Sequence, residues 1–336
     1  MQDMGTGVAT TMRAVVQERY GEAGVVMRPA RVPRPAPGPG EVLVRVHAAG
    51  VDRSVWHLTT GLPWPARLAG YGVRAPRTPV RGADLAGTVE EVGPGVSEFA
   101  PGDAVFGVGR GAYAEFALAS PAKLAAMPGS LSFEAAASLP ISGLTALQAV
   151  RDHARVAAGQ SVLVLGASGG VGVFATQIAR ADGGVVTGVC GPGKAGVARA
   201  AGAMHVLDHT RDEITGRFDV ILDIGGNRTL RTLRRLLTAR GTLVIIGGET
   251  GGKVAGGVDR QLRAIALSPF VSQRLTMFVS SETAAGLRVL AGMAEAGTVA
   301  PIIDRTYPLE SVPEAIDDLA AGRVRGKVVV KVAEPA

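Results

Sequence analysis

A glycine-rich segment in the middle of the chain has the composition of a phosphate-binding turn. An apolar run ending at Leu165 leads directly into Gly166-Ala167-Ser168-Gly169-Gly170-Val171-Gly172. Glycines let the backbone approach a bound group closely, and the helix expected next offers unpaired amides and a partial positive charge. The spacing is one residue off Gly-x-Gly-x-x-Gly, so the flanking strand and helix carry the interpretation. We expect this turn to bind a dinucleotide pyrophosphate; a turn without a ligand is the alternative.

The residues about twenty positions beyond the turn indicate which dinucleotide is bound. NAD sites carry Asp or Glu there, because a carboxylate accepts from the ribose 2′-hydroxyl. That place falls at Cys190, and the stretch Thr187-Gly188-Val189-Cys190-Gly191-Pro192-Gly193-Lys194 contains no acid. Lys194 can pair with a 2′-phosphate, which a carboxylate would repel. We therefore expect NADPH, with Cys190 and Lys194 beside its adenosine; alternatively, Lys194 only begins the next helix.

The spacing of candidate ligands does not indicate a metal site. Cys190 is the single cysteine, which excludes a four-cysteine zinc cluster. His47, His57, Asp52 and Asp84 are further candidates, but nothing in their spacing resembles a zinc motif. We therefore expect no metal. Without a Lewis acid, alcohol oxidation loses its usual charge stabiliser, whereas hydride addition to a quinone or enone spreads the negative charge onto a distant oxygen.

Aromatic side chains are concentrated between residues 50 and 81. Trp56, Trp64 and Tyr71 are three of the six Trp and Tyr residues in the chain. Aromatic residues on a Pro- and Gly-rich segment suit a planar acceptor, so we expect Trp56 and Trp64 to contact substrate; capping of a local core is an equal alternative. Tyr71 is a candidate proton donor, although a structural tyrosine is more common. Asp52 either bonds the ribose or substrate, or pairs with the arginine after it.

Composition limits the class of protein. A chain of 336 residues is long enough for two domains, and 47 glycines indicate many tight turns. The net charge of +6 comes from scattered arginines without interleaved aromatic residues, so a nucleic-acid partner is not expected. The N-terminus has no signal-peptide pattern and no run of about 18 apolar residues occurs, so we expect a cytoplasmic protein without a membrane partner.

The elements that would position these residues change character along the chain. Up to about residue 123, short β-rich segments predict a barrel-like unit, with strands at 12–17, 41–47, 84–92, 103–108 and 111–117. From about residue 132, helices alternate with apolar strands, which is typical of a parallel doubly wound sheet. Strands are predicted at 161–165, 185–189, 205–208, 218–223 and 242–246, and helices at 133–139, 143–154, 171–181, 194–201 and 230–237. A helix at 312–320 and a strand at 327–332 are expected to fold back onto the N-terminal unit.

The order of these parts resembles the zinc-independent quinone oxidoreductase branch of the medium-chain dehydrogenase/reductase superfamily, from about Met12 to Val332. Besides the glycine-rich turn, the similar stretches are Gly102-Asp103-Ala104-Val105-Phe106-Gly107, Leu139-Pro140-Ile141-Ser142-Gly143-Leu144-Thr145-Ala146, Ala201-Gly202-Ala203, Gly241-Thr242-Leu243-Val244 and Gly326-Lys327-Val328-Val329-Val330. Zinc-dependent relatives carry a Cys ligand where this chain has Asp52, and Gly-His-Glu where it has Gly82-Ala83-Asp84.

The resemblance implies an α/β protein with two domains and a cleft between them. A GroES-like β-barrel catalytic domain is expected over 1–140, completed by 281–336, with a Rossmann NADPH-binding domain over 141–280. The further residues expected to line the cofactor are Thr145, Gly247, Gly248, Lys327 and His209, the last in place of a tyrosine that relatives often have near the adenosine. Relatives also commonly dimerise through sheet edges, for which Leu275 to Val279 is the expected strand.

These observations favour zinc-independent, NADPH-dependent hydride transfer to a quinone or an α,β-unsaturated carbonyl compound. The first alternative is a dedicated biosynthetic enoyl or ketone reductase, which would not turn over simple quinones broadly. The second is a non-catalytic NADPH-binding sensor, which would bind NADPH without turnover. The third is a zinc alcohol dehydrogenase, which would contain one zinc per chain.

Overall fold

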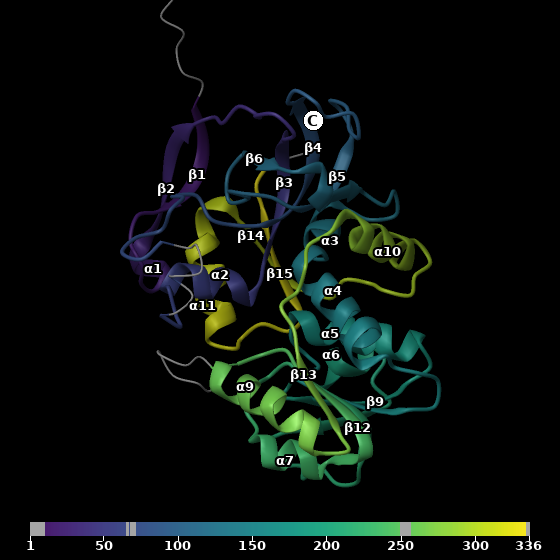
Figure 1. Cartoon of the computed structure of the whole chain (residues 1–336). Helices are drawn as coiled ribbons and strands as arrows, with labels where there is room; N and C mark the ends of the chain where they lie inside the picture. Colours follow the sequence, from purple (N-terminus) through teal and green to yellow (C-terminus); the bar gives the residue numbers. More distant parts are fainter. Residues whose placement is uncertain (1–10, 65–66, 68–71, 249–256, 334–336) are drawn as a thin grey trace, which may run out of the picture.

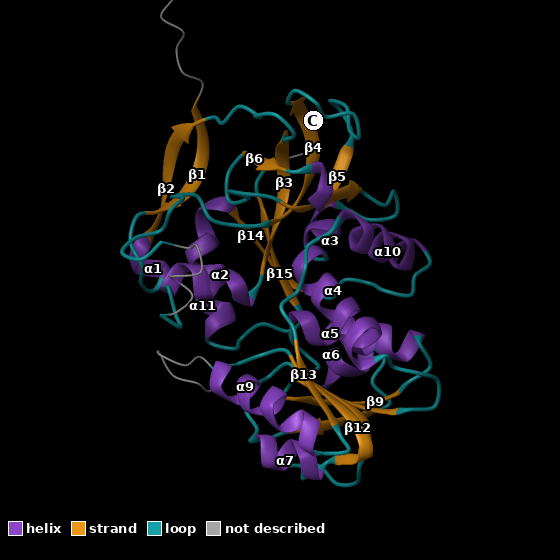
Figure 2. Cartoon of the chain, viewed as in Figure 1, coloured by secondary structure: helices purple, strands orange, loops and turns teal. Residues whose placement is uncertain are grey.

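The computed structural model describes residues 11–64, 67, 72–248 and 257–333. It has two lobes, each built around its own sheet (Figure 1). Strands predominate in the upper lobe, whereas helices flank the sheet of the lower lobe (Figure 2). Both chain ends contribute to the upper lobe, and the middle of the chain forms the lower one.

The upper lobe contains a seven-stranded sheet in the order β14-β15-β3-β4-β5-β7, with β6 paired to β3. Its strands are β3 (Val42–Val51), β4 (Asp84–Val92), β5 (Ala104–Val108), β6 (Phe116–Ala119), β7 (Leu124–Ala126), β14 (Ile303–Pro308) and β15 (Lys327–Lys331). β1 (Thr11–Gln17) and β2 (Met27–Pro33) form a separate antiparallel pair. Val328 of β15 lies opposite Val51 of β3, so the predicted return of the C-terminus is confirmed.

The lower lobe contains a parallel six-stranded sheet in the order β10-β9-β8-β11-β12-β13. The strands are β8 (Ser161–Leu165), β9 (Val185–Cys190), β10 (His205–Asp208), β11 (Phe218–Asp223), β12 (Leu237–Ile245) and β13 (Arg274–Met277). Alternate residues pack on opposite faces: Val162 and Val164 join one buried cluster, and Leu163 and Leu165 join another. A sheet buried on both faces requires continuous apolar strands, and the predicted doubly wound sheet is confirmed.

Helices cover both faces of this sheet. The lower-lobe helices are α4 (Pro140–Leu147), η3 (Gln148–Ala154), α5 (Gly170–Ala181), α6 (Ala195–Ala200), α7 (Leu230–Arg235), α9 (Val258–Leu267) and η4 (Ser268–Phe270). In the upper lobe they are α1 (Ala23–Val26), α2 (Arg53–Thr60), η2 (Pro121–Lys123), α3 (Phe133–Ala137), η5 (Leu309–Ser311) and α11 (Val312–Ala320). Helix α10 (Ala284–Glu295) packs against both α4 and the upper-lobe strand β7 (Figure 1). Side-chain oxygens of Ser132, Thr229 and Thr283 cap α3, α7 and α10, which explains where these helices begin.

Some predicted elements are wrong in their bounds. The strand expected at 111–117 is displaced to β6, because the amide of Tyr113 bonds the carbonyl of Arg81 and its own carbonyl accepts from Val15. The helix expected at 143–154 begins at Pro140 and continues as the π-helical η3. The Pro- and Gly-rich segment after Gly50, for which no helix was predicted, contains helix α2.

No helix among the residues that the structure describes is long and apolar enough to cross a membrane. The domain boundaries near residues 140 and 280 stay a prediction.

Candidate active site

The glycine-rich turn joins β8 to α5 at the carboxyl edge of the parallel sheet. Gly166 has a φ of 91°, and a Cβ placed on Gly172 would lie 2.0 Å from the carbonyl oxygen of Gly166, so both positions require glycine. Gly169 precedes the first turn of α5 and provides no side-chain cap. The first amides of α5, among them those of Gly170 and Val171, therefore remain available to an anion next to Ser168.

A buried lysine from the far end of the chain lies beside this helix N-terminus. Lys327 is 1% exposed, and its Nζ donates to Ser142 Oγ at 3.0 Å and to the carbonyl oxygen of Val51 at 3.3 Å. Its Cδ lies 3.0 Å from where a Cβ on Gly170 would be. The adjacent amide of Gly326 donates to the carbonyl of Ser168 at 2.8 Å. An ammonium next to a helix N-terminus favours a bound anion.

Two buried carboxyl groups complete this cluster. Asp84 Oδ1 accepts from the amide of Ile141 at 2.9 Å, and Oδ2 lies 3.8 Å from Lys327 Nζ. Burial, reinforced by the charge of Asp52, raises the pKa of Asp84 to about 8 against the pull of Lys327. Asp52 caps α2, with Oδ1 accepting from the amide of Ser54 at 2.7 Å. Its Oδ2 is buried without a hydrogen bond to any residue that the structure describes.

The end of β9 carries a second group of cations. Lys194 Nζ donates to the carbonyl oxygen of Val324 at 2.8 Å and to that of Gly322. The guanidinium of Arg325 lies 3.9 Å from where a Cβ on Gly193 would be. Burial and Arg325 both lower the pKa of Lys194. Local sequence reasoning missed Arg325 because only the fold brings the segment before β15 beside the loop after β9.

The remaining predicted cofactor residues lie around this edge of the sheet or on α4. The His209 amide donates to the Cys190 carbonyl at 3.0 Å, and burial raises the pKa of the Cys190 thiol. Thr145 shares α4 with the Ser142 that contacts Lys327, and its hydroxyl donates to Ile141. A Cβ on Gly247 would lie 1.9 Å from the carbonyl oxygen of Ile224, so the loops after β11 and β12 touch. Gly248 follows directly.

The predicted substrate residues are less closely gathered. Trp56 packs at the edge of the upper lobe's core, with the Arg53 guanidinium 4.4 Å from the centre of its ring, and substrate contact stays a prediction beside core capping. Trp64 is 55% exposed. Tyr71 lies outside the described residues.

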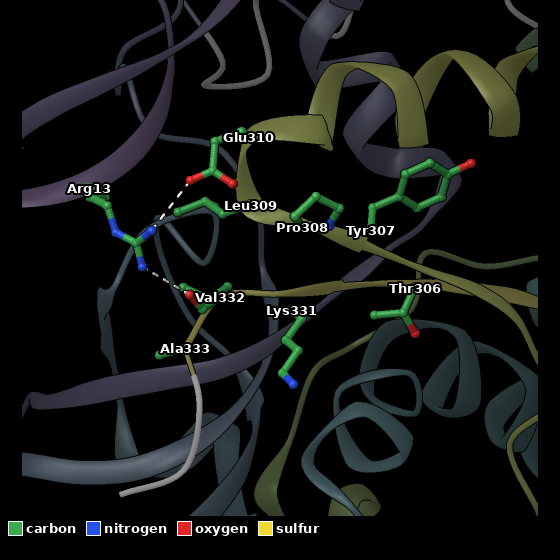
Figure 3. Close-up of a pocket in the computed structure, with 9 residues that line it drawn as sticks. All are labelled: Arg13, Thr306, Tyr307, Pro308, Leu309, Glu310, Lys331, Val332 and Ala333. Carbon is green, nitrogen blue, oxygen red and sulfur yellow. Dashed lines mark hydrogen bonds and ion pairs between the residues drawn. The ribbon is translucent and has the colours of Figure 1, made fainter.

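The cavity in Figure 3 is distinct from all these residues. Its volume is about 390 Å³ and it lies in the upper lobe, lined by Arg13, Thr306, Tyr307, Pro308, Leu309, Glu310, Lys331, Val332 and Ala333. Arg13 crosses it to Glu310 and to the carbonyl of Val332. The cavity therefore contains none of the predicted site residues.

Two family descriptions match the chain. The "Alcohol dehydrogenase GroES-like domain" matches residues 38–129, and "Zinc-binding dehydrogenase" matches residues 201–330. Quinone oxidoreductase of Rattus norvegicus is 34% identical over 97% of this chain and 99% of its own length. A mitochondrial NAD(P)H oxidoreductase of Mus musculus is 32% identical over 96% of this chain and 90% of its own length.

Solved structures agree with these matches. The quinone oxidoreductase from Coxiella burnetii superposes with a TM-score of 0.81 at 26% identity, covering 96% of this chain and 100% of that one. Mycobacterial Rv1454c in complex with NADPH gives 0.78 at 29% identity, covering 95% and 99%. A GroES-like lobe joined to a Rossmann-type sheet with a glycine-rich turn defines an oxidoreductase architecture. The chain belongs to the quinone oxidoreductase branch of the medium-chain dehydrogenase/reductase superfamily, as the sequence predicted.

One matching family is described as zinc-binding, but the described side chains of this chain do not meet what zinc requires. A catalytic zinc takes three protein ligands, and no three His, Cys, Asp or Glu side chains are grouped for a metal within the described part of the chain. His47 Nε2 bonds Thr88 Oγ1 at 3.1 Å, and His57 Nδ1 bonds the carbonyl of Leu62 at 2.8 Å. The Lys327 ammonium beside Asp84 is also unfavourable for a cation. These residues do not fit a zinc site.

Proposed function

We propose that this oxidoreductase is zinc-independent and transfers hydride from NADPH to a quinone or an α,β-unsaturated carbonyl compound. The observation that carries the proposal is the convergence, at one edge of the sheet, of the glycine-rich turn, buried Lys327 and the pair Lys194 and Arg325. In a doubly wound sheet this edge is where a dinucleotide binds, across the point at which strand order reverses. Relatives named quinone oxidoreductases support the acceptor class.

Each half of the cofactor has its own partners in this proposal. The pyrophosphate meets the α5 N-terminus and Lys327, which together supply donors and positive charge. The 2′-phosphate meets Lys194 and Arg325, with no acid between Cys190 and Lys194 to repel it. When bound, NADPH supplies the hydride.

The residue set also favours a conjugated acceptor. Side chains that do not fit zinc leave no Lewis acid for an alkoxide, whereas an enone or quinone delocalises its own developing charge. Asp52, whose Oδ2 has no described hydrogen-bond partner, is the candidate to bond the ribose or substrate. Tyr71 stays a candidate proton donor, and Trp56 and Trp64 stay candidates for contacting the acceptor.

The test is the rate of NADPH oxidation by chelator-treated protein across a panel of quinones and enones, with NADH run in parallel. We expect turnover that survives chelation and that prefers NADPH by about tenfold or more, because a paired 2′-phosphate contributes at least about 1.4 kcal/mol. Metal analysis of the purified protein is the control. One zinc per chain, with activity lost on chelation, would show the proposal to be wrong; NADPH binding without any turnover would favour the sensor.

We further propose that two copies pair through β13. This strand bonds β12 on one side and no other described strand, and large apolar side chains are exposed near it, Phe270 at 83% and Val279 at 85%. Sedimentation should show a dimer, and Phe270→Asp with Val279→Asp should yield monomers, since buried charge opposes association. Met204→Asp, 68% exposed just before the opposite edge strand β10, is the matched control. A monomeric parent protein would contradict this proposal.

A further inference from the structure

One arginine joins three segments next to the predicted cofactor loops. Arg260 lies in α9 and is 8% exposed. Its Nη1 forms an ion pair with Asp223 Oδ2 and donates to the carbonyl oxygen of Arg228 at 2.9 Å. Its Nη2 donates to the carbonyl oxygen of Gly247 at 2.8 Å. A single guanidinium therefore connects α9 to the end of β11, to the loop after β11 and to the loop after β12.

Asp223 anchors this connection inside the sheet. It is the last residue of β11 and is fully buried. Its Oδ1 accepts from the amide of Gly226 at 3.1 Å, and its carbonyl oxygen accepts from the amides of Ile246 at 3.0 Å and Gly247 at 3.1 Å. Burial raises the pKa of Asp223 and the Arg260 charge opposes that rise, so each partner compensates the other's burial. Loss of Arg260 would leave a buried carboxyl group without its counter-ion.

The backbone around Gly247 leaves little room for adjustment. A Cβ on Gly247 would lie 1.9 Å from the carbonyl oxygen of Ile224. Gly225 in turn approaches the glycine-rich turn: its amide nitrogen lies 3.2 Å from where a Cβ on Gly166 would be, and it donates to the carbonyl of Leu165 at 3.0 Å. The loops after β8, β11 and β12 are thus packed backbone to backbone. A shift of Gly247 would therefore displace the loop after β11 and, through Gly225, the glycine-rich turn that is proposed to bind the cofactor.

Arg260 and Asp223 lie on one side of the point where the strand order reverses, and this tells which half of a dinucleotide they are near. The strand order reverses between β8 and β11, and a dinucleotide lies across such a point. The adenosine side is β8 and β9, where the 2′-position is read. The nicotinamide side is therefore β11 and β12, whose ends Arg260 connects.

We propose that Arg260 is a positioning residue that holds the backbone at Gly247, two residues after β12, for the nicotinamide half of NADPH. The adenosine half depends instead on the glycine-rich turn and the end of β9. This inference rests on the proposed function, because it takes NADPH as the ligand. Arg260 can fulfil this role without contacting the cofactor itself, because it acts through the carbonyl oxygen of Gly247.

The test compares NADPH with 2′,5′-ADP, which has the adenosine and 2′-phosphate but no nicotinamide, as ligands of the full chain. Arg260→Met should weaken NADPH binding about tenfold and leave 2′,5′-ADP binding within about twofold. Arg263→Met is the matched control, because Arg263 is on the same helix but its side chain is 77% exposed and pairs with Asp259 of that helix. It should change neither affinity.

Arg260→Lys carries the same comparison if the methionine variant does not fold. Lysine keeps the charge beside Asp223 but cannot bond three acceptors in the fixed geometry of a guanidinium. NADPH binding should therefore again weaken, while 2′,5′-ADP binding should not. Equal weakening of both ligands would mean that the pair only supports the lobe and would overturn the inference, as would no change in either. Parent protein that binds NADPH but reduces no acceptor would defeat the proposed function alone; parent protein that does not bind NADPH would defeat both.

Discussion

Replacing Lys194 and Arg325 together by alanine is expected to raise the KM for NADPH about 100-fold, because two charge-assisted hydrogen bonds to a phosphate contribute about 3 kcal/mol or more. The KM for NADH should change by less than about threefold, since NADH has no 2′-phosphate for these cations to meet. Lys194 reaches the segment before β15 through the carbonyl oxygens of Gly322 and Val324. The two cations therefore come from different lobes and meet at the end of β9.

The control for this prediction is Arg323→Ala. Arg323 lies two positions before Arg325, but its guanidinium is engaged by Asp318, with Nε donating to Oδ1 at 2.7 Å. Removing it takes away one positive charge from the same segment without removing a phosphate partner, so the ratio of the KM values for NADPH and NADH should stay unchanged. Initial-rate kinetics with each cofactor measure both effects. An equal rise in KM for NADPH and NADH in the double variant would contradict the assignment.

The sequence was most informative where local pattern and tertiary structure agree. The strands β4, β8, β10 and β11 and the helix α11 were predicted with their observed bounds, because continuous or alternating apolar residues leave few other ways to bury them. The glycine-rich turn was recognisable for the same reason: Gly166 and Gly172 are required by backbone geometry that recurs wherever a strand turns directly into a helix.

The predictions failed where contacts between segments distant in sequence determine the structure. Nothing local shows that Arg325 approaches Gly193, or that Arg260 reaches Asp223, since each pair is joined only through the fold. Helix α2, in contrast, was missed although the signal was present: Asp52 caps its first turn, and Gly61 ends it in the left-handed region. The strand expected at 111–117 failed because hydrogen bonds to other segments compete with its own ladder.

Asp84 should make the protein less stable as pH rises from about 4 to 8. Its pKa is about 8 in the folded state, against 3.8 for an exposed aspartate. Below 4 the group is protonated in both states; between 4 and 8 only the folded state holds the proton, so unfolding releases it and becomes easier with rising pH. The neutral acid also leaves the charge of Lys327 uncancelled beside the α5 N-terminus, where a phosphate would lie.

The measurement is urea denaturation between pH 5 and pH 8, with Asp84→Asn as the reference because an amide does not titrate. Relative to this variant, the parent protein should lose about 3.6 kcal/mol in free energy of unfolding over that range, since a full proton released on unfolding changes stability by about 1.4 kcal/mol per pH unit and the release is half complete at pH 8. The loss should level off above pH 8, where Asp84 is ionised in both states. Parallel pH curves for the two proteins would show that Asp84 is already ionised in the folded protein. Its negative charge would then cancel the positive charge of Lys327, and the glycine-rich turn would have less positive charge beside it than inferred.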